Sequence, residues 1–314
     1  MSIATTKNNR RIKLNLVTEK FSKGIMTCVY KNISITTAVS LSICTVITLL
    51  ISCGGNSTAS LNASDAINTE NANDNNKIST PPAALTLDTF YKKYLDVSGI
   101  PVISSDNVPD EALFAVQRTI SEMMSMRKDV LAKMIENKLR VGIIAKSEVT
   151  KEMPEYRNLE EDNSGRLWND TRGLGATTYR PLSSCAEENI LCYGKGNDPY
   201  YNEDILVHEF AHSVHQLGIV FVDTGFNTEL QQAFDDAKAN GHWLNTYAGS
   251  NAFEYFAEGV QDWFNLNAEA IPTDSIHNDI NTRAELKAYD PVLYNIIKRY
   301  FPENYGKISC HPQY

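Results

Sequence analysis

Two histidines and a glutamate stand close together in the run VHEFAHSVH, which spans residues 207–215. His208 and His212 are four residues apart, and Glu209 directly follows the first histidine. On an α-helix, side chains four residues apart lie one above the other, so both imidazoles can reach a single metal ion. Glu209 would then project beside the ion rather than onto it, where its carboxylate can accept a proton from water.

A His-Glu-x-x-His run on a helix is the arrangement that zinc peptidases use. Here it lies in a predicted helix over residues 202–217, with an apolar side facing the core and the motif residues on the opposite side. We expect Asn202 to cap the start of this helix and His215 to lie on the protein surface. Because so short a pattern also recurs by chance, a third ligand has to decide the interpretation.

The third ligand cannot be the histidine of the longer, eleven-residue form of the motif. The positions that this form needs as Gly and His hold His215 and Gly218 instead. The next candidate segment is a predicted helix over residues 251–266, which carries an apolar stripe on one side. A separate face of that helix carries three polar side chains: Glu254, Glu258 and Gln261. A second helix packed on the first could therefore aim a carboxylate at the metal.

These residues resemble a known family of zinc peptidases, the gluzincins. His208-Glu209-x-x-His212, followed by Tyr247 and by Glu254 seven residues later, is similar to the metalloprotease domain of anthrax lethal factor and to the related Pro-Pro endopeptidases. The resemblance covers roughly residues 200–298. It implies a zincin-like metalloprotease domain with Zn²⁺ as the cofactor, and it does not extend to the identity of the substrate.

The resemblance also implies a role for each matching residue. His208, His212 and Glu254 would be the zinc ligands, and Glu209 would be the general base. Tyr247 would hydrogen-bond the oxyanion that develops on the substrate. A further acid, Glu258, would contact one of the zinc ligands, rather than the zinc itself, and so orient that ligand. We also expect the loop 171–182 to supply an edge along which the substrate aligns.

The elements that must position these residues are helices that follow a small sheet. We expect a helix over 87–99, one long or two shorter helices over 108–138, a strand over 139–147, and loops with short strands over 150–201. Further helices are expected over 202–217, 228–240, 251–266 and 291–299. This pattern predicts an α+β fold in which the active-site helix 202–217 packs near the helix 251–266.

The N-terminus has the layout of an export signal. Residues 1–31 carry seven Lys and Arg side chains and one acid, and residues 32–52 are uncharged. The run LLISCGG resembles a bacterial lipobox in which Cys53 receives the lipid. We therefore predict a lipoprotein signal peptide over residues 1–52 and a lipid-anchored, exported protein of the bacterial cell envelope, on the outer membrane or cell surface. The alternative is an uncleaved transmembrane helix over the same uncharged stretch.

Composition separates a tether from a folded domain. Residues 53–86 are rich in Asn, Ser, Thr and Ala and hold almost nothing large to bury, so we predict a disordered tether. Residues 87–314 then form one catalytic domain.

The whole chain has a net charge of −9, and removal of the basic leader makes the rest more acidic. This argues against nucleic acid as a partner and against electrostatic adhesion to anionic lipid.

Three cysteines remain in the predicted domain. Cys185 and Cys192 bracket six residues and could form a disulfide in an oxidising compartment. Cys310 would then be free or exchanged, and buried thiols are the alternative for all three. The spacing of these cysteines does not match a zinc–thiolate cluster.

Taken together, the sequence predicts a monomeric zinc-dependent endopeptidase that acts on a protein or peptide substrate and is held at the membrane by its N-terminal lipid. Two alternatives stay open. One is a zinc-dependent hydrolase of a non-peptide amide or glycan substrate. The other is a surface lipoprotein that binds zinc without catalysis, although pure metal binding does not need Glu209.

Overall fold

The computed structural model describes residues 77–160 and 167–312. The predicted signal peptide, the predicted lipidation site Cys53 and residues 53–76 of the predicted tether lie outside the described residues. Within the described part, Ser79 forms an isolated bridge with Tyr94, and Ala83–Leu85 form a short 3₁₀ turn.

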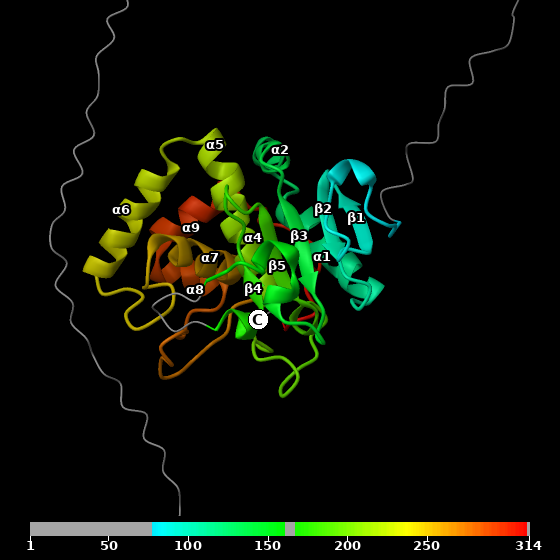
Figure 1. Ribbon diagram of the computed structural model, residues 1–314. Coiled ribbons are helices and arrows are strands. Elements are labelled where there is room, and N and C mark those ends of the chain that lie inside the picture. Colours follow the sequence, from blue (N-terminus) through cyan, green and yellow to red (C-terminus); the bar gives the residue numbers. More distant parts are fainter. Residues whose placement is uncertain (1–76, 161–166, 313–314) are drawn as a thin grey trace, which may run out of the picture. The chain divides into compact units, whose positions relative to one another are not determined.

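A mixed five-stranded sheet forms one layer of the fold (Figure 1). Its strands lie in the order β1-β2-β3-β5-β4. The three central strands β2, β3 and β5 are parallel, and the edge strands β1 and β4 run antiparallel to their neighbours. The strands are β1 (Lys93–Val97), β2 (Ile100–Ser104), β3 (Arg140–Ile144), β4 (Gly173–Leu174) and β5 (Leu182–Ala186). The predicted strand 139–147 is therefore confirmed as β3.

The predicted helix over 87–99 is wrong, because this segment forms β1 and a tight hairpin. Val97 pairs with Ile100 across a two-residue turn. Ser98 and Gly99 both have positive φ, of 54° and 91°, and this backbone matches the twist of a two-stranded ribbon. Leu95 and Val97 are buried, while Asp96 between them is half-buried, so the strand period of two overrides the helical spacing of the larger apolar residues.

Helices make up most of the rest of the domain. Residues 108–138 form two helices rather than one long one: α1 (Asp110–Met123) and α2 (Lys128–Glu136). The later elements are α3 (Glu187–Ile190), α4 (Ile205–Val214), the π-helical turn η5 (His215–Ile219), α5 (Val220–Val222), α6 (Phe226–Ala239), α7 (Ala252–Trp263), α8 (Arg283–Tyr289) and α9 (Pro291–Lys298). The fold is thus α+β, with a small sheet followed by helices, as predicted.

The two faces of the sheet line two apolar cores. Val102 and Val141 face a main core that the helices complete, whereas Ile103 and Ile144 face a smaller core around Tyr156. Neighbouring strand residues point to opposite faces of a sheet, so both faces of the central strands are covered. The site helix α4 belongs to the main core.

α4 starts later than predicted. It begins at Ile205, and its N-cap is Asp204, whose side chain accepts a hydrogen bond from the Val207 amide at 2.9 Å; the expected cap Asn202 lies outside the helix. With η5 and α5 it forms an apolar helical run over 205–222, which by length and composition could cross a membrane. Because 72% of this run is buried inside the fold, we treat it as a core helix.

The disulfide joins different cysteines from the pair suggested by spacing. Cys192 is bonded to Cys310, across a Cα–Cα distance of 6.0 Å. Cys185 is a free, buried thiol, so a Cys185–Cys192 bridge is wrong. The reason is that Cys185 lies on β5 with its side chain in the main core, while Cys192 follows α3 and meets the C-terminal segment.

Candidate metal centre

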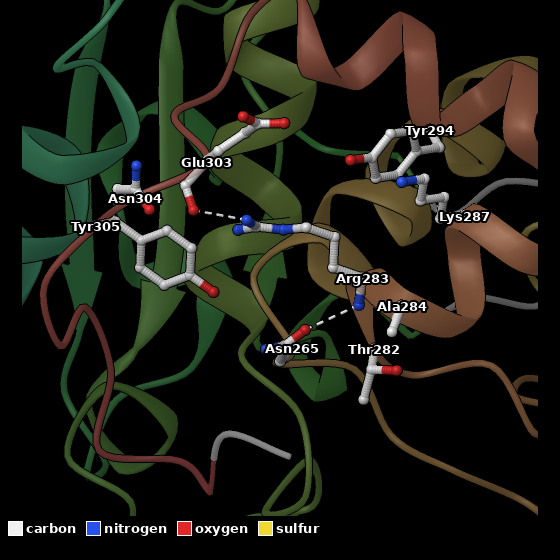
Figure 2. A pocket seen from close by; sticks show the side chains of 9 residues that line it. All are labelled: Asn265, Thr282, Arg283, Ala284, Lys287, Tyr294, Glu303, Asn304 and Tyr305. Atoms are coloured by element: carbon white, nitrogen blue, oxygen red, sulfur yellow. Dashed lines mark hydrogen bonds between the residues drawn. The ribbon is translucent and has the colours of Figure 1, made fainter.

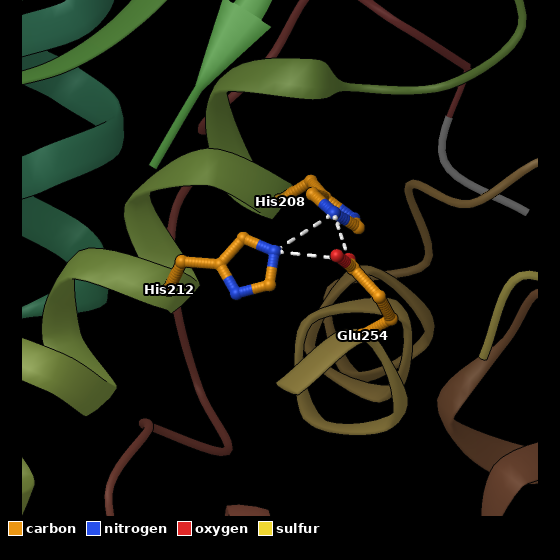
Figure 3. Close-up of side chains that lie close together, drawn as sticks. All are labelled: His208, His212 and Glu254. Atoms are coloured by element: carbon orange, nitrogen blue, oxygen red, sulfur yellow. Dashed lines mark hydrogen bonds and ion pairs between the residues drawn. The ribbon is translucent and has the colours of Figure 1, made fainter. Parts of the chain in front are cut away.

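Three side chains from two helices meet at one point (Figure 3). His208 and His212 lie on α4, Glu254 lies in the first turn of α7, and the two helices pack against each other. The Asn251 side chain caps α7 by accepting hydrogen bonds from the amides of Phe253 and Glu254. The predicted packing of the active-site helix on the second helix is therefore observed.

The distances are short enough for one shared ion. Glu254 Oε2 lies 3.1 Å from His208 Nε2 and 3.0 Å from His212 Nε2, and the two Nε2 atoms are 3.1 Å apart. Ligand atoms placed about 2.0–2.2 Å from a tetrahedral zinc ion lie about 3.3–3.6 Å from one another, so a small outward shift of these side chains would admit the ion. Two imidazoles and a carboxylate are also a donor set that zinc accepts. These residues therefore fit a zinc ion.

The close contacts in the cluster shift the pKa values of two of its members. Burial lowers the pKa of His208, but its hydrogen bonds to Glu254 and Glu258 outweigh burial and raise this pKa well above its ordinary value. Burial raises the pKa of Glu254, and the hydrogen bonds to both histidines outweigh it and lower this pKa. A cation that binds here must displace the proton, so its affinity falls as the pH falls.

Glu209 lies on the side of α4 that faces the edge strand β4. The side chain is half-buried, and a Cβ atom added at Gly173 would come within 3.0 Å of its Oε1 atom. A Cβ atom at Gly175 would come within 2.6 Å of the His212 Cβ atom. The segment around β4 therefore runs directly beside the motif.

Tyr247 lies in the turn that precedes α7. Its ring stacks on the ring of His208, with 6.1 Å between centroids and 27° between planes. Its backbone amide donates a hydrogen bond to the Ile276 carbonyl at 2.8 Å. The structure thus places the ring of Tyr247 beside the candidate ligand His208.

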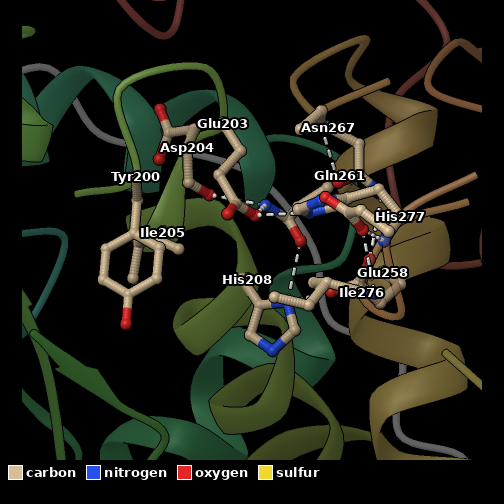
Figure 4. Close-up of polar contacts among 12 residues, drawn as sticks. Tyr200, Glu203, Asp204, Ile205, His208, Glu258, Gln261, Asn267, Ile276 and His277 are labelled. Carbon is tan, nitrogen blue, oxygen red and sulfur yellow. Dashed lines mark hydrogen bonds and ion pairs between the residues drawn. The ribbon is translucent and has the colours of Figure 1, made fainter. Parts of the chain in front are cut away.

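Two side chains of α7 lie behind His208 (Figure 4). Glu258, which the resemblance assigns to orienting a ligand, has its Oε1 atom 3.3 Å from His208 Nδ1. Gln261 lies closer, with its Oε1 atom 2.7 Å from the same nitrogen. The sequence places Gln261 on the same face as Glu254 and Glu258 but gives it no role. Its position seven residues after Glu254, two helical turns along, is the signal that could have indicated one.

The expectation of a surface position for His215 is wrong. Its side chain is 1% exposed and packs against the rings of Phe226, Phe253 and Phe256. Its Nε2 atom lies 2.7 Å from Asn227 Oδ1. The physical reason is that α6 and α7 cover this end of the site helix. Burial lowers the pKa of His215 to about 4, so the buried ring is neutral at pH 7 and plays no part in the ligand cluster.

A pocket of about 750 Å³ lies apart from the ligand cluster, between α8 and the C-terminal segment (Figure 2). Arg283 lines it and donates hydrogen bonds to the carbonyls of Trp263 and Glu303. Its guanidinium also lies over the rings of Trp263 and Tyr305. These contacts give Arg283 a packing role that joins α7 and α8 to the C-terminal segment.

No family model matches the sequence, and no curated protein sequence matches it. Among solved structures, the chain is similar to the Pro-Pro endopeptidase PPEP-2 from Paenibacillus alvei, at 17% sequence identity and a TM-score of 0.44. The match covers 64% of this chain and 97% of that chain. At this identity and TM-score, the similarity assigns neither a family nor an activity to the protein.

Proposed function

We propose that this protein is a zinc-dependent endopeptidase of the gluzincin type, which hydrolyses peptide bonds in a protein or peptide substrate. The observation that carries the proposal is the meeting of His208 Nε2, His212 Nε2 and Glu254 Oε2 within 3.1 Å of one another. Zinc held by such a set acts as a Lewis acid, which polarises a carbonyl and lowers the pKa of water to about 7.

Glu209 and Tyr247 supply the remaining chemistry in this proposal. Glu209 follows a ligand directly in sequence, so its carboxylate can accept a proton from the attacking water and pass it to the leaving amine. Tyr247 lies over the ring of His208, from where its hydroxyl can donate a hydrogen bond to the developing oxyanion. Glu258 lies at the Nδ1 side of the His208 ring, with its Oε1 atom 3.3 Å from that nitrogen.

The substrate is proposed to bind as an extended strand along β4. This strand pairs with β5 on one side, and no strand among the described residues pairs with its other side. An extended peptide can add to such an edge through backbone hydrogen bonds. Since β4 runs beside Glu209 and His212, a peptide bound there would pass next to the ligand cluster.

We also propose that the protein is exported and lipid-anchored through Cys53. The Cys192–Cys310 disulfide supports export, because disulfides form and persist in oxidising compartments. Replacement Cys53→Ser should abolish the incorporation of a labelled fatty acid and move the protein out of the membrane fraction. Unchanged labelling in this variant would contradict the anchor.

Zinc content and peptide hydrolysis of the purified full-length protein test the proposed activity. We expect about one zinc per chain and cleavage of a peptide library that a chelator stops and added zinc restores. Glu254→Ala should lose the metal, whereas Glu269→Ala, which changes an exposed acid, should keep it. A wild-type protein without zinc, or one that cleaves only non-peptide amides or glycan substituents, would overturn the proposal.

A further inference from the structure

We propose that Gln261, rather than Glu258, is the residue that positions His208 for the metal, and that Glu203 holds Gln261 in that role. The inference rests on the zinc centre of the proposed function. It concerns the polar network behind the ligands, which links α7 to the start of α4 (Figure 4).

His208 turns its two ring nitrogens in different directions. Nε2 points to the ligand cluster, so Nδ1 is left for a partner that fixes the ring and its tautomer. With the proton on Nδ1, Nε2 keeps the lone pair that a metal ligand needs. One N–H serves one strong hydrogen bond. Gln261 Oε1 at 2.7 Å is within the usual range, whereas Glu258 Oε1 lies at 3.3 Å.

The orientation of the Gln261 amide follows from its other contacts. Its Nε2 atom donates to Glu203 Oε2 and to the Asp204 carbonyl, each at 3.2 Å. Both partners are oxygen acceptors, so a flipped amide would place oxygen against oxygen twice. The side chain is also fully buried, and water cannot replace the lost bonds. The amide oxygen must therefore face His208.

Each of the two acids in the network has a further partner. Glu258 accepts a hydrogen bond from Asn267 Nδ2 at 3.2 Å through its other oxygen. Glu203 Oε2 lies 3.4 Å from His277 Nε2. His277 directly follows Ile276, whose carbonyl accepts the Tyr247 amide. One segment of the chain thus supports both the Gln261 anchor and the aromatic ring over His208.

The test measures zinc affinity by competition with a chelator, on the full-length protein and independently of any peptidase assay. Gln261→Met keeps the length of the side chain but removes its amide. We expect it to weaken zinc binding about 10–100-fold. Because its buried partners lose their hydrogen bonds, the unfolding temperature of the metal-free protein should fall as well, so zinc affinity is measured at a temperature where the metal-free variant is folded. Gln232→Met, an exposed position on α6, is the matched control and should bind zinc like the wild type.

A second variant separates positioning from simple packing. The double change Glu203→Gln with Gln261→Glu restores an oxygen acceptor for His208 and reverses the donor between residues 203 and 261, but it leaves the Asp204 carbonyl without its donor. We therefore expect this pair to recover part of the zinc affinity that Gln261→Met loses, and to restore the visible absorption spectrum of the cobalt-loaded protein.

Several results would overturn the inference. They are wild-type affinity in Gln261→Met, no recovery in the double variant, or a larger loss in Glu258→Gln than in Gln261→Met. A wild-type chain that takes up no zinc would remove the metal centre itself, and this inference with it. A chain that binds zinc but cleaves no peptide would overturn only the proposed function.

Discussion

Glu209 and Glu254 are two acids beside the same pair of histidines, and their surroundings suit them to different proposed roles. Glu254 places one oxygen within 3.1 Å of both imidazoles, which suits a ligand. Glu209 is on the same helix as the histidines and points toward β4. An acid in that position can exchange protons with water without occupying the metal.

Replacement Glu209→Gln tests this division at the level of one residue. The amide cannot accept the proton from water, so we expect kcat to fall about 100–10,000-fold, the usual contribution of a general base. Zinc content should stay the same, because the three ligands are untouched. Metal analysis and peptide hydrolysis on the same preparation check both parts, and full activity in this variant would refute the proton-transfer role.

The sequence indicates individual residues best where their geometry is local. His208 and His212 are one helical turn apart, so their convergence needs only a helix. The partnership of Gln261 with Glu203 joins side chains 58 residues apart, and sequence spacing holds no information about it. The burial of His215 was missed for the same reason, since segments distant in sequence create its aromatic surroundings.

At the scale of elements, two glycines let β4 approach the site helix. Gly173 and Gly175 leave no room for a Cβ atom, because Ile205 and His212 would lie 2.5 and 2.6 Å from it. The predicted substrate edge in the loop 171–182 falls on this segment. The glycines of this loop allow it to pack closely against α4, but the sequence alone does not show that it does so.

Gly175→Ala should therefore disturb the metal centre without changing a ligand. The added methyl group pushes against His212, so we expect a loss of about 1–3 kcal/mol in the free energy of unfolding, as for other overpacked sites. Zinc affinity should fall as well. Gly225→Ala is the matched control, because its Cβ atom would meet only Asp223 Oδ1 at an ordinary 3.5 Å. Equal zinc affinity in the two variants would contradict the close packing of β4 on α4.

The π-helical turn η5 gives the domain a predicted sensitivity to acid. His215 has a pKa lowered by burial to about 4 in the folded protein, against an ordinary value of 6.5. The unfolded chain therefore binds this proton at a higher pH than the folded protein does. As the pH falls from 6.5 to 4, protonation favours the unfolded state, and the folded protein loses stability.

His215→Leu should remove this part of the acid sensitivity. Between pH 6.5 and 4, we expect the free energy of unfolding of the wild type to fall by about 3 kcal/mol more than that of the variant. Denaturant titrations at several pH values, all with chelator present, measure the difference while the ligand cluster stays metal-free in both proteins. Parallel curves for the two proteins would exclude His215 as the group responsible.

At the scale of the whole molecule, the fold class could be predicted, and the first hairpin and the long-range connections could not. The α+β class and the helix pair at the site follow from local periodicity. The predicted helix over 87–99 forms β1 instead, because the apolar spacing of a short segment fits both a helix and a strand, and the pairing with β2 decides between them. Spacing leaves the disulfide pairing open, because chain topology rather than spacing brings Cys310 to Cys192.

The Cys192–Cys310 disulfide closes a loop with a sequence separation of 118 residues that holds α4, α7, the three candidate zinc ligands, Glu209 and Tyr247. A cross-link over a loop of this length restricts the unfolded chain strongly. We expect Cys192→Ser combined with Cys310→Ser to lower the free energy of unfolding by about 4–5 kcal/mol.

Burial raises the pKa of the Cys185 thiol, so Cys185 should react with thiol reagents only after unfolding. Peptide mapping without reduction checks the pairing, and a linked Cys185–Cys192 peptide would contradict it.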